Sequence, residues 1–185
     1  MTLRPRSSRS LPSPHRELRA RRALTLHQAT GHQHGQAYAL NPVGWYHALL
    51  GDYQQALTAC HQALTLHQEL GNRSGQAATW DSLGYAHHHL GHHTHAITSY
   101  QHALTLYRDL GDRYNEAGTL TNLGDTHHST GNHHAAHDAW QQALTILDEL
   151  DHPDADKVRT KLAGLDTSTV ESTDQDARHN SEPVS

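Results

Sequence analysis

Apolar residues recur along the chain at the spacing of an α-helix. Between Gly51 and Gly71 they stand three, four and seven positions apart, on one helical face: Ala56, Leu57, Cys60, Ala63, Leu64 and Leu70. Asp52 can cap the free N–H groups at the start of this helix, and Gly71 can take the left-handed conformation that ends it. The pattern therefore predicts a helix between these two residues.

A second helical pattern fills the stretch that follows, from Ser74 to Leu90. Its apolar or small residues again share one side: Ala77, Trp80, Leu83, Gly84 and His87. The same two patterns return later in the chain, for example at Ala96, Tyr100 and Leu104 and then at Leu120, Leu123 and Gly124. The repeating unit is therefore predicted to be a pair of helices.

The period of this unit is fixed. The block Ala-Leu-Thr-(Leu/Ile) begins at Ala23, Ala63, Ala103 and Ala143, and each start lies 40 residues after the last. A constant period of this size marks stacked supersecondary units that cannot bury their apolar faces alone. We therefore expect an all-α fold, an αα-superhelix of about three helix pairs with half-repeats at both ends.

Glycine occupies the same point of three of the predicted helices, at Gly44, Gly84 and Gly124. Each glycine costs roughly 1 kcal/mol of helix stability relative to alanine. The recurrence indicates that the backbones of paired helices approach each other closely there. Pro42 breaks the pattern of the first copy, so that helix is predicted either to kink at Pro42 or to start at Asn41.

Composition changes at both ends of the repeated part, and the chain divides into five predicted segments. Pro153 suits the first position of the last helix, which has Val158, Leu162 and Leu165 on one side. The segments are a disordered basic arm at 1–14, a half-repeat helix at 15–33, three helix pairs at 34–152, a capping helix at 153–165 and a disordered tail at 166–185.

The two-helix unit resembles the tetratricopeptide repeat (TPR). The resemblance covers about 34–150 and is carried by the large residue Leu40/Trp80/Leu120, by Val43-Gly44, Leu83-Gly84 and Leu123-Gly124, and by the small alanines. Its 40-residue period is similar to the longer variant of kinesin light chains and bacterial signalling proteins. The amino-acid sequence of the repeats most resembles the C-terminal repeat arrays of bacterial SARP-type and NB-ARC regulators. That resemblance implies a detached or truncated sensor module, because Lys157 and Lys161 are the only lysines and no phosphate-binding loop exists in this sequence.

The resemblance also implies where a partner binds. In that fold the first helices of successive pairs line the concave face, and their non-packing residues point into it. The positions are Asn41, Trp45, Ala48, Asp81, Ser82, Tyr85, His88, Thr121, Asn122, Asp125 and His128. Family members often use asparagine at the position of Asn122 to hold a peptide backbone. We therefore expect a protein or peptide partner, with Trp45 and Tyr85 as its main anchors.

Charge suggests a second hypothesis, a DNA-associated regulator. Seven of the 14 Lys and Arg residues lie in the first 22 residues beside one acid, whereas the rest of the chain holds seven bases and 18 acids. No aromatic residue interleaves these arginines, so we do not favour nucleic acid as the partner. One cysteine, no signal peptide and no long apolar run predict a cytoplasmic chain without a membrane partner.

The 21 histidines raise a third hypothesis, a metal-binding protein. His88/His92, His89/His93 and His133/His137 are i,i+4 pairs, but no Cys, Asp or Glu pattern completes a tetrahedral set. We expect no metal, no cofactor and no enzymatic activity, because Gly-x-Ser-x-Gly and His-Glu-x-x-His are missing. Buried histidines should instead make the stack less stable in mild acid.

Overall fold

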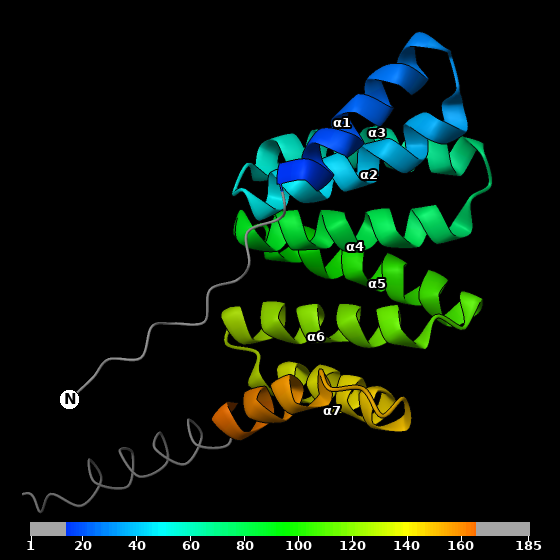
Figure 1. The fold of residues 1–185 in the computed structure, drawn as a ribbon. Helices are drawn as coiled ribbons and strands as arrows, with labels where there is room; N and C mark the ends of the chain where they lie inside the picture. The colour runs from blue at the N-terminus through cyan, green and yellow to red at the C-terminus, as the bar shows by residue number, and fades with distance from the viewer. Residues whose placement is uncertain (1–13, 166–185) are drawn as a thin grey trace, which may run out of the picture. The chain divides into compact units, whose positions relative to one another are not determined.

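The computed structural model describes residues 14–165, and the predicted arm and tail lie outside this range except for Pro14. All regular elements in the described range are helices, as predicted (Figure 1). They are α1 (Pro14–Ala29), α2 (Gln33–Leu49), α3 (Tyr53–Glu69), α4 (Arg73–His89), α5 (His93–Leu110), α6 (Arg113–Ser129) and α7 (His133–Glu149), followed by a helix at 155–165.

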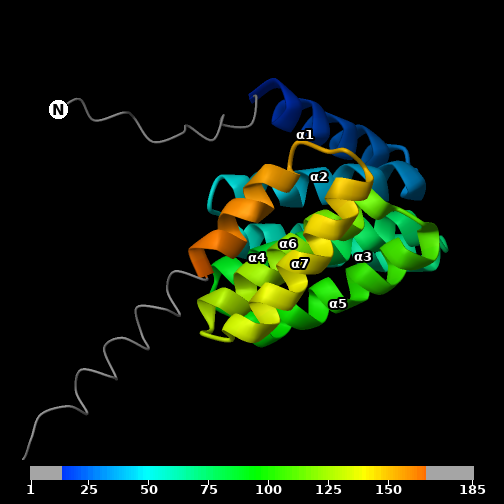
Figure 2. The same cartoon turned by 90° about the horizontal axis from the view of Figure 1, so that it is seen from below.

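The chain divides into two compact units, Met1–Leu110 and Gly111–Ser185. In the first unit each helix from α1 to α5 packs against the next, and α2 also contacts α4. In the second unit α6 packs against α7, and the helix at 155–165 lies beside both (Figure 2). The contact between α2 and α4 brings positions 40 residues apart to one surface of the first unit.

The helices end in a turn that recurs every 20 residues. Glycine takes a left-handed φ between +63° and +87° at Gly31, Gly51, Gly71, Gly91, Gly111 and Gly131. After Gly31, Gly51, Gly71, Gly91 and Gly131 the next residue donates its N–H to a carbonyl five positions back, as in His32 N to His27 O at 2.9 Å. The seventh turn uses Asp151 at φ 49°. The predicted role of Gly71 is confirmed, whereas Asp52 stands at the N-cap without a capping hydrogen bond from its side chain.

The three helix glycines meet the partner helix at very short range. A Cβ on Gly44 would lie 2.5 Å from Cys60 Sγ, and one on Gly84 would lie 2.5 Å from the ring of Tyr100. A Cβ on Gly124 would lie 2.4 Å from the ring of Trp140. The predicted close approach of the backbones is found at Gly44, where a Cβ would lie 3.1 Å from Ala56 O. At Gly84 and Gly124 the prediction is wrong, because the nearest atoms belong to an aromatic side chain of the partner helix.

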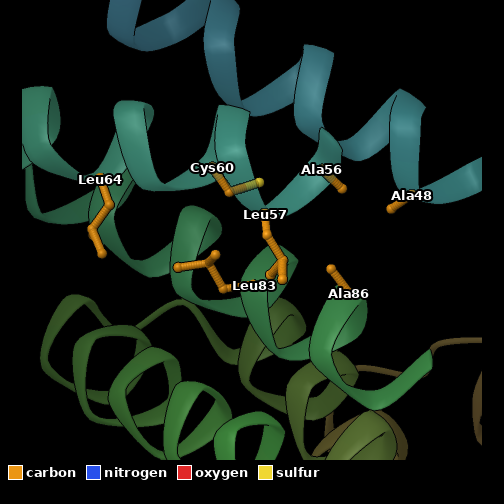
Figure 3. Packing of buried hydrophobic residues seen from close by; sticks show 7 residues of the cluster. All are labelled: Ala48, Ala56, Leu57, Cys60, Leu64, Leu83 and Ala86. Atoms are coloured by element: carbon orange, nitrogen blue, oxygen red, sulfur yellow. The ribbon is translucent and has the colours of Figure 1, made fainter. Parts of the chain in front are cut away.

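Small residues bring α2, α3 and α4 together in the core of the first unit (Figure 3). Leu57 on α3 packs with Leu83 and Ala86 on α4, whereas Cys60 on α3 lies against Gly44 on α2. Leu57, Cys60, Leu83 and Ala86 are all buried. Burial raises the pKa of the Cys60 thiol to about 12, so this cysteine is an un-ionised core residue at neutral pH.

Two helices do not start at the residues that Pro42 and Pro153 suggested. The helix α2 runs through Pro42, so a start at Asn41 is wrong. Regular helix near the C-terminus begins at residue 155, two residues after Pro153, because Ala155 N bonds to His152 O in a tight first turn. Val158, Leu162 and Leu165 are buried there as expected.

Candidate functional site

Two aromatic side chains from equivalent positions lie side by side on the first unit. The rings of Trp45 on α2 and Tyr85 on α4 have centroids 4.9 Å apart and are tilted by 58°. Both side chains are half-buried. The packing of α2 against α4 therefore joins two predicted partner-binding residues into one surface.

Two further rings extend this pair. His89 lies 4.3 Å from Tyr85, centroid to centroid, and Tyr53 stacks on His89 at 5.0 Å with an angle of 8°. We call Trp45, Tyr53, Tyr85 and His89 the aromatic surface. Tyr53 and His89 were not among the predicted site residues, because Tyr53 is the first residue of α3 and His89 the last of α4, and neither belongs to the repeating face.

The other predicted residues of the first unit have mixed environments. His88 is half-buried, with its ring 5.0 Å from His89, and Asp81 is also half-buried. Asn41 Oδ1 accepts a weak hydrogen bond from Cys60 Sγ at 3.8 Å, which turns it partly toward the core. Two predictions are wrong, since Ala48 and Ser82 are buried. Ala48 belongs to the core cluster, and the Ser82 hydroxyl donates to Ala78 O at 3.0 Å.

In the second unit the position equivalent to Trp45 and Tyr85 is Asp125. Its carboxylate accepts hydrogen bonds from Trp140 Nε1 at 3.1 Å and from Lys161 Nζ at 2.7 Å. Asp125 therefore stabilises the unit internally. The exposed His128 lies with its ring 5.5 Å from Trp140, and Thr121 is half-buried with its hydroxyl donating to Ala117 O.

Asn122, also half-buried, lines a cavity of about 240 Å³ between α6, α7 and the helix at 155–165. The lining residues are Tyr114, Gly118, Thr121, Asn122, Leu147, Asp154, Lys157, Val158 and Lys161. This cavity was not expected from the sequence. The one available signal was Gly118, a glycine of α6 that does not belong to the recurring set.

The histidines around the turn between α4 and α5 are packed against one another. His87 stacks on His95 at 5.2 Å and lies 5.8 Å from His92, centroid to centroid. Burial, together with the neighbouring His95, His92 and His61, lowers the pKa of His87 to about 4. Burial also lowers the pKa of His67 and of His127. Within residues 14–165 no three side chains of the metal-binding types are placed to hold one ion.

Most of the basic arm lies outside the described residues. Among the arginines of the first 22 residues, Arg21 on α1 pairs with Glu17 at 2.9 Å and also contacts His47 Nε2 at 3.4 Å, while Arg19 and Arg22 are exposed on α1. None of the helices in the described part is long and apolar enough to cross a membrane.

The family model of the tetratricopeptide repeat matches residues 36–109 and 75–149, so the chain belongs to the TPR family. Solved structures agree on the fold. BtubC from P. vanneervenii superposes with a TM-score of 0.70 at 17% identity over 84% of this chain and 66% of its own. The apo form of RapI gives a TM-score of 0.72 at 12% identity over 84% of this chain and 44% of its own.

A kinesin light chain from Podosopora anserina, with nearly identical TPR-like repeats, gives a TM-score of 0.61 at 13% identity over 89% of each chain. The predicted αα-superhelix of tetratricopeptide repeats is therefore confirmed. This chain spans 66% and 44% of the lengths of BtubC and RapI. No curated protein matches the sequence.

Proposed function

We propose that this chain is a protein- or peptide-binding TPR scaffold and that the aromatic surface is the centre of its binding face. The contact between Trp45 and Tyr85 carries this proposal. Half-exposed aromatic rings bury a large area on binding while losing little side-chain entropy, so they are favoured anchors at interfaces. Stacking on His89 and Tyr53 holds the pair in place before a partner arrives.

The polar residues near these rings suit an extended backbone. Asp81 and His88 flank Tyr85 on α4. Separately, the second unit carries Asn122, a carboxamide at the position that TPR proteins often use to hold a peptide. A similar structure, with a TM-score of 0.68 at 16% identity, is a Rap protein complexed with competence and sporulation factor. That complex supports a factor-binding role for the fold.

We place this scaffold in bacterial regulation, as the sensor part of a SARP-type or NB-ARC regulator in the cytoplasm, and assign it no catalytic activity. This proposal is supported by the resemblance of the repeat sequences to those of such regulators and by the Rap structures with the same fold. Sequencing the reading frame upstream tests this origin, and an NTPase module there is the expected result. An unrelated reading frame would contradict it.

A direct test of binding uses the full chain and a library of random dodecapeptides displayed on phage. The selected peptides should bind at neutral pH, and Trp45→Ala and Tyr85→Ala should each weaken binding at least tenfold when fluorescence anisotropy measures it. Leu26→Ala is the control, because Leu26 is a 62% exposed apolar residue on α1, away from the aromatic surface. A folded Trp45→Ala variant that binds as tightly as the wild type would overturn the proposal.

A further inference from the structure

Five glycines inside helices are explained by packing. Gly44, Gly84 and Gly124 lie under Cys60, Tyr100 and Trp140, and a Cβ on Gly35 or Gly75 would come within 2.3 Å of a histidine ring. Gly118 in α6 is different, because a Cβ there would have nothing within 4 Å and its φ is that of an ordinary helix. Glycine destabilises a helix interior relative to alanine. Packing therefore gives no reason for glycine at position 118.

Gly118 instead forms part of the wall of the 240 Å³ cavity. Tyr114 lies one turn before it and Asn122 one turn after it, so the glycine opens the middle of a helical face. The equivalent positions of the other copies hold Tyr38 and Ala78. This position of the repeat therefore accepts a side chain, and the absence of one at Gly118 enlarges the cavity.

The charges around this cavity are balanced. Lys157 Nζ bonds to Asp154 Oδ1 at 2.5 Å, and Lys161 Nζ bonds to Asp125 Oδ1 at 2.7 Å. What remains for a ligand is an apolar wall made mainly by the ring of Tyr114 and the aliphatic stems of the lysines, which lie over the buried Leu147 and Val158. An uncharged group can bind here without disturbing either ion pair.

The wall is also held in position. The Tyr114 hydroxyl donates to Asp154 Oδ2 at 3.2 Å, and its ring lies 4.6 Å from that of His152. Val158 is buried, which anchors the opposite side. A cavity of ~150 Å³ lined by apolar side chains can hold a molecule of benzene. A space of about 240 Å³ is therefore large enough for one aromatic side chain.

We propose that this cavity, opened by Gly118, is a pocket for one uncharged aromatic side chain of a peptide or protein partner. It deepens the proposed function, on which it rests, by naming an anchor residue that the partner carries. Asn122 on the rim is free to bond to the backbone next to that anchor, because the same helix face presents both.

The first test is an NMR titration of the full 15N-labelled chain with N-acetyl-L-phenylalaninamide. Saturable shifts in the millimolar range are expected at the amides of Tyr114, Gly118 and Val158. N-acetyl-L-alaninamide and the α-amide of N-acetyl-L-glutamate should bind at least tenfold more weakly. The alanine side chain leaves the cavity unfilled, and the glutamate side chain brings a negative charge. Equal shifts with all three probes, or none with the first, would overturn the pocket.

Variants at glycine separate binding from stability. Gly118→Ala should raise the melting temperature by about 2–5 °C, and Gly118→Leu should fill the cavity and weaken binding of N-acetyl-L-phenylalaninamide at least tenfold. Gly164→Leu is the matched control, since Gly164 is exposed and a Cβ there also meets nothing within 4 Å. The control should keep the affinity of the wild type. A folded Gly118→Leu variant with unchanged affinity would contradict the proposal.

The same variants distinguish this inference from the proposed function. If selected dodecapeptides lose affinity in Trp45→Ala but not in Gly118→Leu, the aromatic surface binds partners and the pocket is not part of the site. If no peptide is selected but N-acetyl-L-phenylalaninamide binds at Gly118, the pocket stands and the proposed peptide scaffold falls.

Discussion

The two units use the same helical position for different purposes. In the first unit Trp45 and Tyr85 are half-buried rings in contact with each other. In the second unit the equivalent residue is Asp125, which accepts hydrogen bonds from Trp140 and Lys161. The difference shows that a repeat fixes where a side chain lies, whereas its chemistry decides whether it packs against a neighbouring ring or is held in the unit by hydrogen bonds.

The side chains that cover the helix glycines differ in a similar way. Cys60 covers Gly44 in the first pair, and the much larger Trp140 covers Gly124 in the second unit. The indole of Trp140 also reaches the Thr121 carbonyl at 3.2 Å. The larger residue at this position therefore also adds a hydrogen bond between the two helices of its pair, from Trp140 on α7 to Thr121 on α6.

The largest expected effect comes from adding a methyl group at Gly124. Its Cβ would lie 2.4 Å from the ring of Trp140, and such overpacking costs about 1–3 kcal/mol. Gly118→Ala on the same helix should have the opposite sign and stabilise the protein. Urea unfolding of both variants measures the difference, and equal effects would contradict the assigned roles of the two glycines.

The next largest effect on stability is expected at Asp125, which occupies the same repeat position as Tyr85. Asp125→Ala leaves Trp140 Nε1 and Lys161 Nζ without this acceptor and should cost roughly 1–2 kcal/mol, reduced by the partial exposure of both charges. Tyr85→Ala should instead act mainly on binding of the selected peptides. Denaturant midpoints and anisotropy on both variants test this, and the comparison fails if Tyr85→Ala is the more destabilising change.

Much of the fold follows from the sequence because its causes are local. Helical spacing, glycine at the turns and the 40-residue period gave the helices and their pairing. The proximity of Trp45 and Tyr85 was also predictable, since equivalent faces of first helices lie together in TPR proteins. The bonds of Asp125 were not, because they depend on how far the indole of Trp140 and the ammonium of Lys161 reach. The pocket depends on an absent side chain and on the packing of the last helix, neither of which has a periodic signal.

A smaller effect, of stabilising sign, is expected at Asp151. This residue takes φ 49° at the turn where the other copies use glycine. Left-handed backbone is strained for most residues, so Asp151→Gly should add about 0.5–1 kcal/mol to the free energy of unfolding. Gly131→Ala, at the preceding turn, is the reverse control and should destabilise. Thermal melts decide the sign, and a destabilised Asp151→Gly variant would count against this role for the turn.

A further prediction is a dependence of stability on pH that arises at the turn between α4 and α5. Because the pKa of His87 is lowered to about 4 in the folded chain, the unfolded chain binds a proton first as pH falls. The stability that neutral His87 contributes is complete above the unfolded pKa of about 6.5 and is lost between there and pH 4. The lowered pKa values of His67 and His127 act in the same direction.

Melting curves at pH 7 and pH 5 test this assignment. His87→Gln should narrow the difference between the two midpoints, because it removes one group that resists protonation when folded. His134→Gln is the control, since the His134 side chain is 90% exposed. If both variants narrow the difference equally, the acid sensitivity does not arise at His87.

The most direct measurement of the central claim is the indole N–H resonance of Trp45 in the full chain, followed while a selected dodecapeptide is added. The account predicts that this signal shifts and saturates together with binding. The indole signal of Trp80, whose ring stacks on His102 at 4.6 Å, should stay in place. An unchanged Trp45 signal in the saturated complex would contradict the claim that partners bind on the aromatic surface.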